Sequence, residues 1–400
     1  MDTAALPGEI MARFLHFMTS DFPRLNSSCR DGGHSLSDWI ASTGPIVREM
    51  SSLVSRQLAP EDAELLVRGG GMMVLASERL AQPKGHEPGE ILRQLPGLTD
   101  MLIHLTAPYG RPALTHKGYW LNNLPPQQLT FTNSTYEKFF IGAVQAQAAM
   151  RRAVNDSLAL ICTDAVQADT SIAARLVQSA AEVLEQSQLQ YRDFHRGHDG
   201  LPGQTPAEFN EMRVWLTKTC IGGVTYGGPN AAYIPEMVAT DFVMGTADDH
   251  YVEYVTGFFG EFDEKERRLL ESHIERPSII EMISRSLGYV DASSMALAPV
   301  IQVAGRLAES PNLLATATAG RSLFKMFCGG SGAHVGLINT HLIKHGESMT
   351  PGERAALPVD PGKGVGGHEH DHTWRLHNMR RTNPAWRNLA GAINRINSSP

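Results

Sequence analysis

The sequence is poor in cysteine and has no cysteine motif. Its four cysteines are scattered over 400 residues, with neither a CxxC nor a CxxCH spacing. These absences argue against a zinc knuckle and against a haem attached covalently to the chain. Free thiols in a reducing cytoplasm are the simplest interpretation.

Long apolar runs and long basic runs are missing as well. No apolar segment reaches the roughly 20 residues that a membrane-spanning helix needs, and residues 1–22 lack the basic and apolar regions of a signal peptide. The net charge is −7, so nucleic acid is not an expected partner. We therefore expect a cytoplasmic protein that binds neither membranes nor nucleic acids.

Alternating runs of β-branched residues are nearly absent, so the sequence predicts a mainly α protein. A smaller N-terminal domain of mixed or helical character is expected over residues 1–120, where glycine and proline clusters such as Gly69-Gly70-Gly71 interrupt the helical patterns. A large helical domain is expected over residues 121–400. Amphipathic patterns predict helices over residues 45–57, 60–80, 135–155, 157–168, 171–195, 208–219, 233–244, 264–273, 278–287, 293–309 and 385–397.

The most informative stretch runs from Cys328 to His345. Read as a helix, it gathers along one side His334, Leu337, Ile338, His341 and His345. Several glycines around His334 leave the helix surface bare, so a flat and bulky group can approach the backbone. Gly346 is expected to end the helix. We interpret His334 as the ligand of a haem iron, and the alternative is a core histidine on an apolar helix face.

Two clusters follow that helix. Residues 361–368, PGKGVGGH, look like a glycine-rich loop that can close over a site. His368, His370 and His372 alternate directly after it. Imidazoles are ligands of zinc and iron, so one interpretation is a metal site. Because the spacing is not that of HExxH, the other is a solvated or gating loop.

Earlier in the chain, arginine and aromatic residues suggest the other walls of a site. Arg213 offers a fork of donors to a carboxylate, although a surface arginine is the commoner case. Tyr136, Phe139 and Phe140 share one face of their expected helix, where they either pack in the core or line a pocket.

Further motifs follow one another from about residue 70 to 390. They are Gly85-His86-Glu87-Pro88, Leu95-Pro96-Gly97-Leu98, Tyr119-Trp120, Phe194-His195 with His198-Asp199, Phe209 with Arg213, Tyr226-Gly227-Gly228-Pro229, Ala333-His334 and Gly364-Val365-Gly366-Gly367. In this order they resemble the histidine-ligated haem-dependent aromatic oxygenases, the superfamily of indoleamine and tryptophan 2,3-dioxygenases. The closest resemblance is to monodechloroaminopyrrolnitrin synthase-like proteins.

The resemblance implies an indoleamine dioxygenase-like helical bundle that holds haem b, with His334 as the ligand of the iron. It implies that the residues beside the cofactor are Gly332, Ala333 and Phe139. On the substrate side it implies Phe209, Tyr136 and Arg213, of which Arg213 holds a substrate carboxylate. It also implies a loop that covers the substrate, made of Gly364, Val365, Gly366 and Gly367.

Two departures from the family pattern bear on the reaction. Val365 replaces a hydroxyl residue of the relatives' loop, and Tyr136 stands where they have a small residue. We therefore expect a haem b oxygenase that uses O₂ or peroxide on an indole or other aromatic amino acid, or a derivative, in specialised metabolism. The alternatives are a tryptophan 2,3-dioxygenase giving N-formylkynurenine, a non-haem metalloprotein using His368, His370 and His372, and a haem sensor or carrier without turnover. The sequence leaves the oligomeric state open, a homodimer included.

Overall fold

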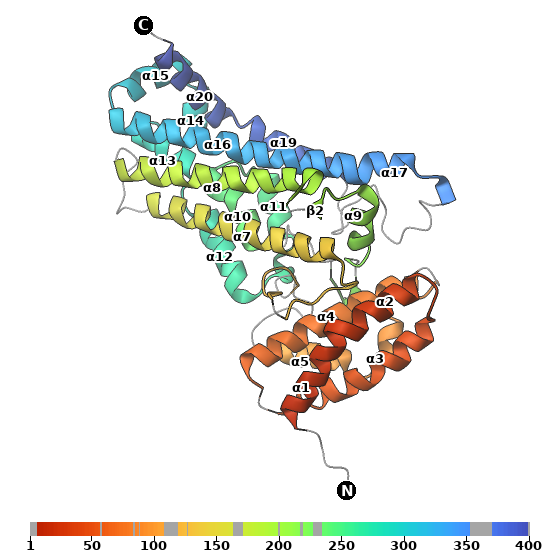
Figure 1. The fold of residues 1–400 in the computed structure, drawn as a ribbon. Helices are drawn as coiled ribbons and strands as arrows, with labels where there is room; N and C mark the ends of the chain where they lie inside the picture. Colours follow the sequence, from red (N-terminus) through yellow and green to blue (C-terminus); the bar gives the residue numbers. More distant parts are fainter. Residues whose placement is uncertain are drawn as a thin grey trace.

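The computed structural model describes residues 6–56, 58–82, 85–87, 89–107, 119–125, 127–162, 171–198, 201–216, 219–226, 234–352 and 370–398. Helices dominate throughout, which confirms the expected mainly α class. The described strands form two short antiparallel hairpins (Figure 1). They are β1 (Gly197–His198) with β2 (Leu201–Pro202), and β3 (Thr219–Ile221) with β4 (Val224–Tyr226).

The first hundred residues form a group of helices at one end of the molecule (Figure 1). The group consists of α1 (Pro7–His16), η1 (Phe17–Asp21), α2 (Phe22–Arg30), α3 (Leu36–Ser51), α4 (Pro60–Ala81), η3 (Ile91–Gln94) and α5 (Leu98–Thr106). Its apolar core, which contains Trp39 and Met73, continues into Phe131, Ile141 and Trp215. The helix expected over residues 60–80 is confirmed as α4, and the interruption expected at Gly69-Gly70-Gly71 is wrong, because these glycines lie buried inside this helix.

Close packing explains why glycine occupies this part of α4. A Cβ built on Gly69 would lie 2.3 Å from Cζ of Phe14, which belongs to α1. One built on Gly70 would lie 2.9 Å from the Met101 side chain of α5. These glycines therefore let α4 approach its neighbours closely.

Gly69→Ala is expected to destabilise the protein. Overpacking against Phe14 costs about 1–3 kcal/mol, which exceeds the roughly 1 kcal/mol that alanine gains over glycine inside a helix. Gly305→Ala is the matched control, because Gly305 is an exposed helical glycine with nothing within 4 Å of its Cβ position. Urea unfolding of both variants provides the measurement. Equal stabilisation by both changes would show that α4 has room for a methyl group at Gly69.

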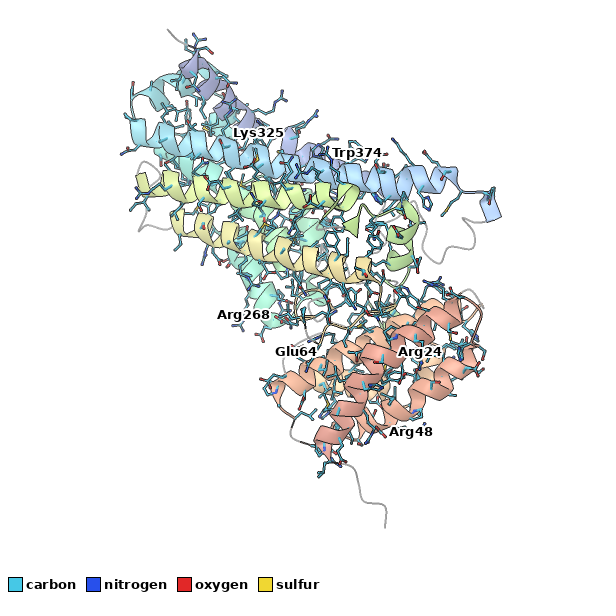
Figure 2. All side chains as sticks on the ribbon, in the orientation of Figure 1. Arg24, Arg48, Glu64, Arg268, Lys325 and Trp374 are labelled. Carbon is cyan, nitrogen blue, oxygen red and sulfur yellow. The ribbon has the colours of Figure 1, made fainter. Side chains whose placement is uncertain are left out.

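Three long helices run side by side through the rest of the molecule (Figure 1). Here α8 lies antiparallel to α7 and parallel to α16, and side chains fill the space between them (Figure 2). The long helices and the elements that continue or flank α16 are α7 (Thr135–Ile161), α8 (Ser171–Arg196), α16 (Pro311–Ile338), η7 (Asn339–Ile343), α17 (Lys344–Ser348) and α19 (His370–Arg381).

Shorter helices surround these three. They are α9 (Pro206–Arg213), α10 (Pro235–Met244), α11 (Asp249–Thr256), η6 (Phe259–Glu261), α12 (Glu264–Glu275), α13 (Ile279–Ser286), α14 (Ala292–Leu297), α15 (Val300–Ala308) and α20 (Pro384–Asn397). The helix expected over 208–219 ends early, at Arg213, and strand β3 begins at Thr219. The helix expected over 293–309 is two helices, because Pro299 separates α14 from α15 and precedes the first residue of the second.

The helix that carries His334 also differs from its expected form. Residues 339–343 form a π-helical turn, in which the N–H of Lys344 bonds to the carbonyl of Asn339. The α-helical periodicity therefore ends at Ile338, and it no longer relates His334 to His341. The expected stop at Gly346 is wrong, because α17 continues through this buried glycine as far as Ser348. Among the described helices, none combines the length and the apolar character needed to cross a lipid bilayer.

Candidate functional site

The contact between α8 and α16 positions His334. The two helices approach closely where Gly329 faces Gln188, since a Cβ on Gly329 would lie 2.7 Å from the Gln188 amide oxygen. One turn further along both helices, the rings of Tyr191 and His334 lie 5.5 Å apart at an angle of 32°. The glycine-rich sequence before His334 therefore lets α8 bring an aromatic ring against this imidazole.

His334 is uncharged near neutral pH. Desolvation, followed by the positive charges of Arg380 and Arg151, lowers its pKa to about 4. His334 nonetheless keeps accessible surface. The imidazole therefore combines nearby protein, which lowers its pKa, with open space next to the residue. A neutral imidazole next to open space is what a metal ligand requires.

The helix surface beside His334 is bare. Gly330 lies one turn before His334, and although it is buried, a Cβ built on it would meet nothing within 4 Å. A buried glycine next to open space leaves room for a flat group against the helix. With the neutral imidazole, this bare surface fits the fifth ligand and the near face of a haem b group.

A charged network closes one side of this site. Arg380 of α19 donates from Nε and Nη2 to the two oxygens of Asp241 on α10, at 2.8 and 2.6 Å. Its third nitrogen, Nη1, donates to Oγ of Ser331 at 3.0 Å. Asp241 is fully buried, and its charge is the largest influence that raises the pKa of Arg380. This buried pair fixes α19 against α10 and α16.

Aromatic residues form the opposite side of the site, where α7, α8 and α9 meet the end of α16. We call them the aromatic cluster, and its members are Phe139, Phe140, Ala143, Tyr191, Phe194, Phe209, Met212, Leu337, Ile338 and Leu342. The ring of Phe194 lies 5.3 Å from each of Phe139 and Phe140. The cluster is apolar, its buried rings pack against one another, and it adjoins His334 through Tyr191.

Arg213 and His341 are both buried near this cluster. Arg213 follows Phe209 by one helical turn and is 4% exposed. His341 donates from Nε2 to the carbonyl of Gln204 at 2.9 Å, and its own carbonyl accepts from the Asn210 side chain at 2.9 Å. These bonds join η7 to α9, so His341 has a structural role in the core.

Of the remaining predicted residues, some lie near His334, one lies apart from the aromatic cluster, and others fall outside the described residues. Gly332 faces α19, since its Cβ position is 3.3 Å from the His377 ring, and Ala333 is half-buried beside it. Tyr136 lies in the first turn of α7 and outside the aromatic cluster as described. The loop residues Gly364, Val365, Gly366 and Gly367, and His368 with them, lie outside the described residues.

The alternating histidines are only partly described. The ring of His372 packs 4.2 Å from that of Tyr254 on α11, and His370 begins the backbone of α19. Within the described part of the chain, no three His, Cys, Asp or Glu side chains gather as a metal site would require. A haem would need only one such ligand from the chain.

Four residues of the site were not predicted as such from the sequence: Arg151, Tyr191, Asp241 and Arg380. Arg151 carried one visible signal. It occupies the apolar side of α7 together with Ala148, Val154 and Leu158, all of them buried, where a charged residue is unusual. Asp241 and Arg380 are 139 residues apart in sequence, and neither helix pattern shows that they pair.

A scan against protein-family models finds no family that matches the chain, and a search of the curated proteins finds no matching relative. The resemblance to the haem-dependent aromatic oxygenases remains a prediction from the sequence motifs.

Proposed function

We propose that this chain is a haem b-dependent oxygenase that acts on an indole or other aromatic amino acid, or on a derivative of one. His334 is the observation that carries the proposal. Desolvation lowers its pKa to about 4, the residue keeps accessible surface, and the surface of its own helix is bare at Gly330. A satisfied core histidine such as His341 has none of these properties together.

Bound haem b supplies an iron that activates O₂ or peroxide. The chain supplies binding and orientation. His334 offers a neutral nitrogen to the iron, and the aromatic cluster offers an apolar wall to an aromatic substrate. Arg213 is the residue proposed to hold the carboxylate of an amino-acid substrate, since a guanidinium binds a carboxylate through two parallel hydrogen bonds. Exclusion of water by the buried walls protects reactive species from side reactions.

Reconstitution with haem tests the cofactor. The purified protein, incubated with haem b and desalted, is expected to show a Soret band and one haem iron per chain, without stoichiometric zinc. Absence of a Soret band would contradict the proposal. A stoichiometric metal outside haem that disappears when His368, His370 and His372 are changed to Ala would favour the metalloprotein alternative. N-formylkynurenine formed from tryptophan would identify the dioxygenase alternative.

Arg213→Lys tests the substrate class. Lysine keeps the charge and loses the planar fork, so binding of an amino-acid substrate is expected to weaken roughly tenfold or more, in line with about 1.5–3 kcal/mol for a charge-assisted hydrogen bond. Binding of 3-methylindole, which has no carboxylate, is expected to change little. The measurement is a titration of the Soret shift with tryptophan and with 3-methylindole.

The two ligands separate the roles of Arg213. Equal losses for both would mean that this buried arginine supports the fold or the cofactor. No loss for either would remove Arg213 from the substrate site and leave the amino-acid class without its proposed binding group.

A further inference from the structure

The guanidinium of Arg151 is a buried charge for which the described residues supply no hydrogen-bonded or ion-paired partner. Arg151 lies in the middle of α7 and is 8% exposed. Its Nε has no hydrogen-bond partner, and no carboxylate of the described residues forms an ion pair with it. Its Cζ lies 5.2 Å from the centre of the Phe327 ring. Buried charges in proteins are normally paired or hydrogen-bonded, so this arrangement indicates a place for an external anion.

Asp241 does not supply the missing partner. Its charge acts on Arg151, but no hydrogen bond joins the two, and its two oxygens accept from Arg380 at 2.8 and 2.6 Å. One of them also accepts from the Thr246 hydroxyl at 2.7 Å. Arg380 lies 5.1 Å from the same Phe327 ring as Arg151. The guanidiniums of Arg151 and Arg380 therefore both contact the Phe327 ring. Asp241 neutralises only one of these two positive charges, so among the described residues one remains without a counter-charge.

This surplus charge lies beside His334. Phe327, Ser331 and His334 are spaced four and three residues apart, so they share one face of α16. Phe327 contacts both guanidiniums, and Ser331 accepts a hydrogen bond from Arg380. The bare helix surface at Gly330 borders the same face. An anion that reaches Arg151 therefore belongs to a ligand whose body adjoins His334.

We propose that Arg151 binds a carboxylate of the ligand that lies beside His334, with Arg380 as a second positive charge nearby. The planar guanidinium matches a carboxylate, and the aromatic cluster on the other side of His334 matches an apolar body. Such a carboxylate has two sources, a haem propionate or the free carboxylate of an organic substrate. In its haem form the inference rests on the proposed function, whereas binding of a small carboxylate does not.

The stability of the ligand-free protein gives the first test. Arg151→Met keeps an unbranched apolar side chain as far as the position of Nε and removes the guanidinium with its unpaired charge. Replacing an uncompensated buried charge by a well-packed apolar side chain is often neutral or stabilising, so the thermal midpoint is expected to stay the same or to rise. A lower midpoint would show that Arg151 has a partner inside the protein, and would overturn the inference.

Binding gives the second test. Wild type is expected to bind haem b about tenfold or more tightly than haem dimethyl ester, and Arg151→Met is expected to bind both alike, if the carboxylate is a propionate. If it belongs to the substrate, Arg151→Met binds haem normally and loses about tenfold for indole-3-propionate, with no change for 3-methylindole. Arg152→Met is the matched control, because this neighbour has a 58% exposed side chain that pairs with Glu236.

The outcomes separate this inference from the proposed function. Identical titrations of Arg151→Met and Arg152→Met in both arms would overturn it. If wild type binds no haem at all, the proposed function fails. The carboxylate site is then tested by the thermal shift that indole-3-propionate gives to the haem-free protein. A shift in wild type and Arg152→Met that is missing in Arg151→Met supports a carboxylate site, and any other pattern refutes it.

Discussion

His334→Ala is expected to abolish stoichiometric haem binding. The structure gives the imidazole a pKa of about 4, so it is neutral under ordinary conditions. It is also the histidine that adjoins both the bare helix surface at Gly330 and the aromatic cluster. Removing it removes the proposed iron ligand and leaves haem b without a protein bond to the metal. The measurement is haem iron per chain after reconstitution and desalting, together with the Soret band.

His341→Gln is the matched control for this loss. The glutamine amide can donate to the Gln204 carbonyl as Nε2 of His341 does, so the link between η7 and α9 survives. This variant is expected to keep haem at the wild-type ratio. Loss of haem in His341→Gln with retention in His334→Ala would show that His341, and not His334, is the ligand. Retention in both variants would refute histidine ligation from this helix.

Asp241→Asn is expected to cause the largest loss of stability. The carboxylate is fully buried and receives two hydrogen bonds from Arg380. Breaking a buried ion pair by removing one partner costs about 3–5 kcal/mol, because the other charge stays behind unpaired. The charge of Asp241 also acts on Arg151, so its loss removes a favourable influence on a second buried arginine. The free energy of unfolding, measured in urea, is expected to fall by about that amount.

A surface ion pair calibrates this result. Arg268→Ala removes the exposed partner of Glu264 on α12 (Figure 2), and it is expected to change the free energy of unfolding by about 0.5 kcal/mol or less. The double change of Asp241→Asn with Arg380→Gln replaces both charges by amides. It is expected to cost less than the sum of the single changes. A loss for Asp241→Asn no larger than that for Arg268→Ala would mean that Arg380 does not depend on Asp241.

The sequence predicted the helices whose apolar residues recur with helical spacing. The patterns over 171–195 and 264–273 correspond to α8 and α12 within a few residues. It failed where packing decides the backbone. Gly69-Gly70-Gly71 looked like a break, but the contacts of Gly69 with Phe14 show that close approach of helices selects glycine there. These contacts join segments far apart in sequence, so no local pattern contains them.

The residues of the candidate site that could be predicted are those with a signal in the local sequence. His334 stood out because glycines surround it in sequence, and Phe209 and Arg213 because their spacing matched a known motif. Asp241, Tyr191 and Arg380 lie on three separate helices, and only the tertiary fold brings them near His334. The π-helical turn at 339–343 was equally hidden, because its five-residue hydrogen bond has no signal in the apolar periodicity.

The pairing of Asp241 with Arg380 also has a consequence for the order of events during synthesis. Arg380 is the 139th residue that the ribosome adds after Asp241. At about 5–20 residues per second, the growing chain spends roughly 7–28 seconds with this acid unmatched. The helix that carries His334 is also complete before the helix that fastens it. A nascent chain therefore holds His334 without α19 packed beside α16, and the proposed binding of haem would have to follow the synthesis and docking of α19.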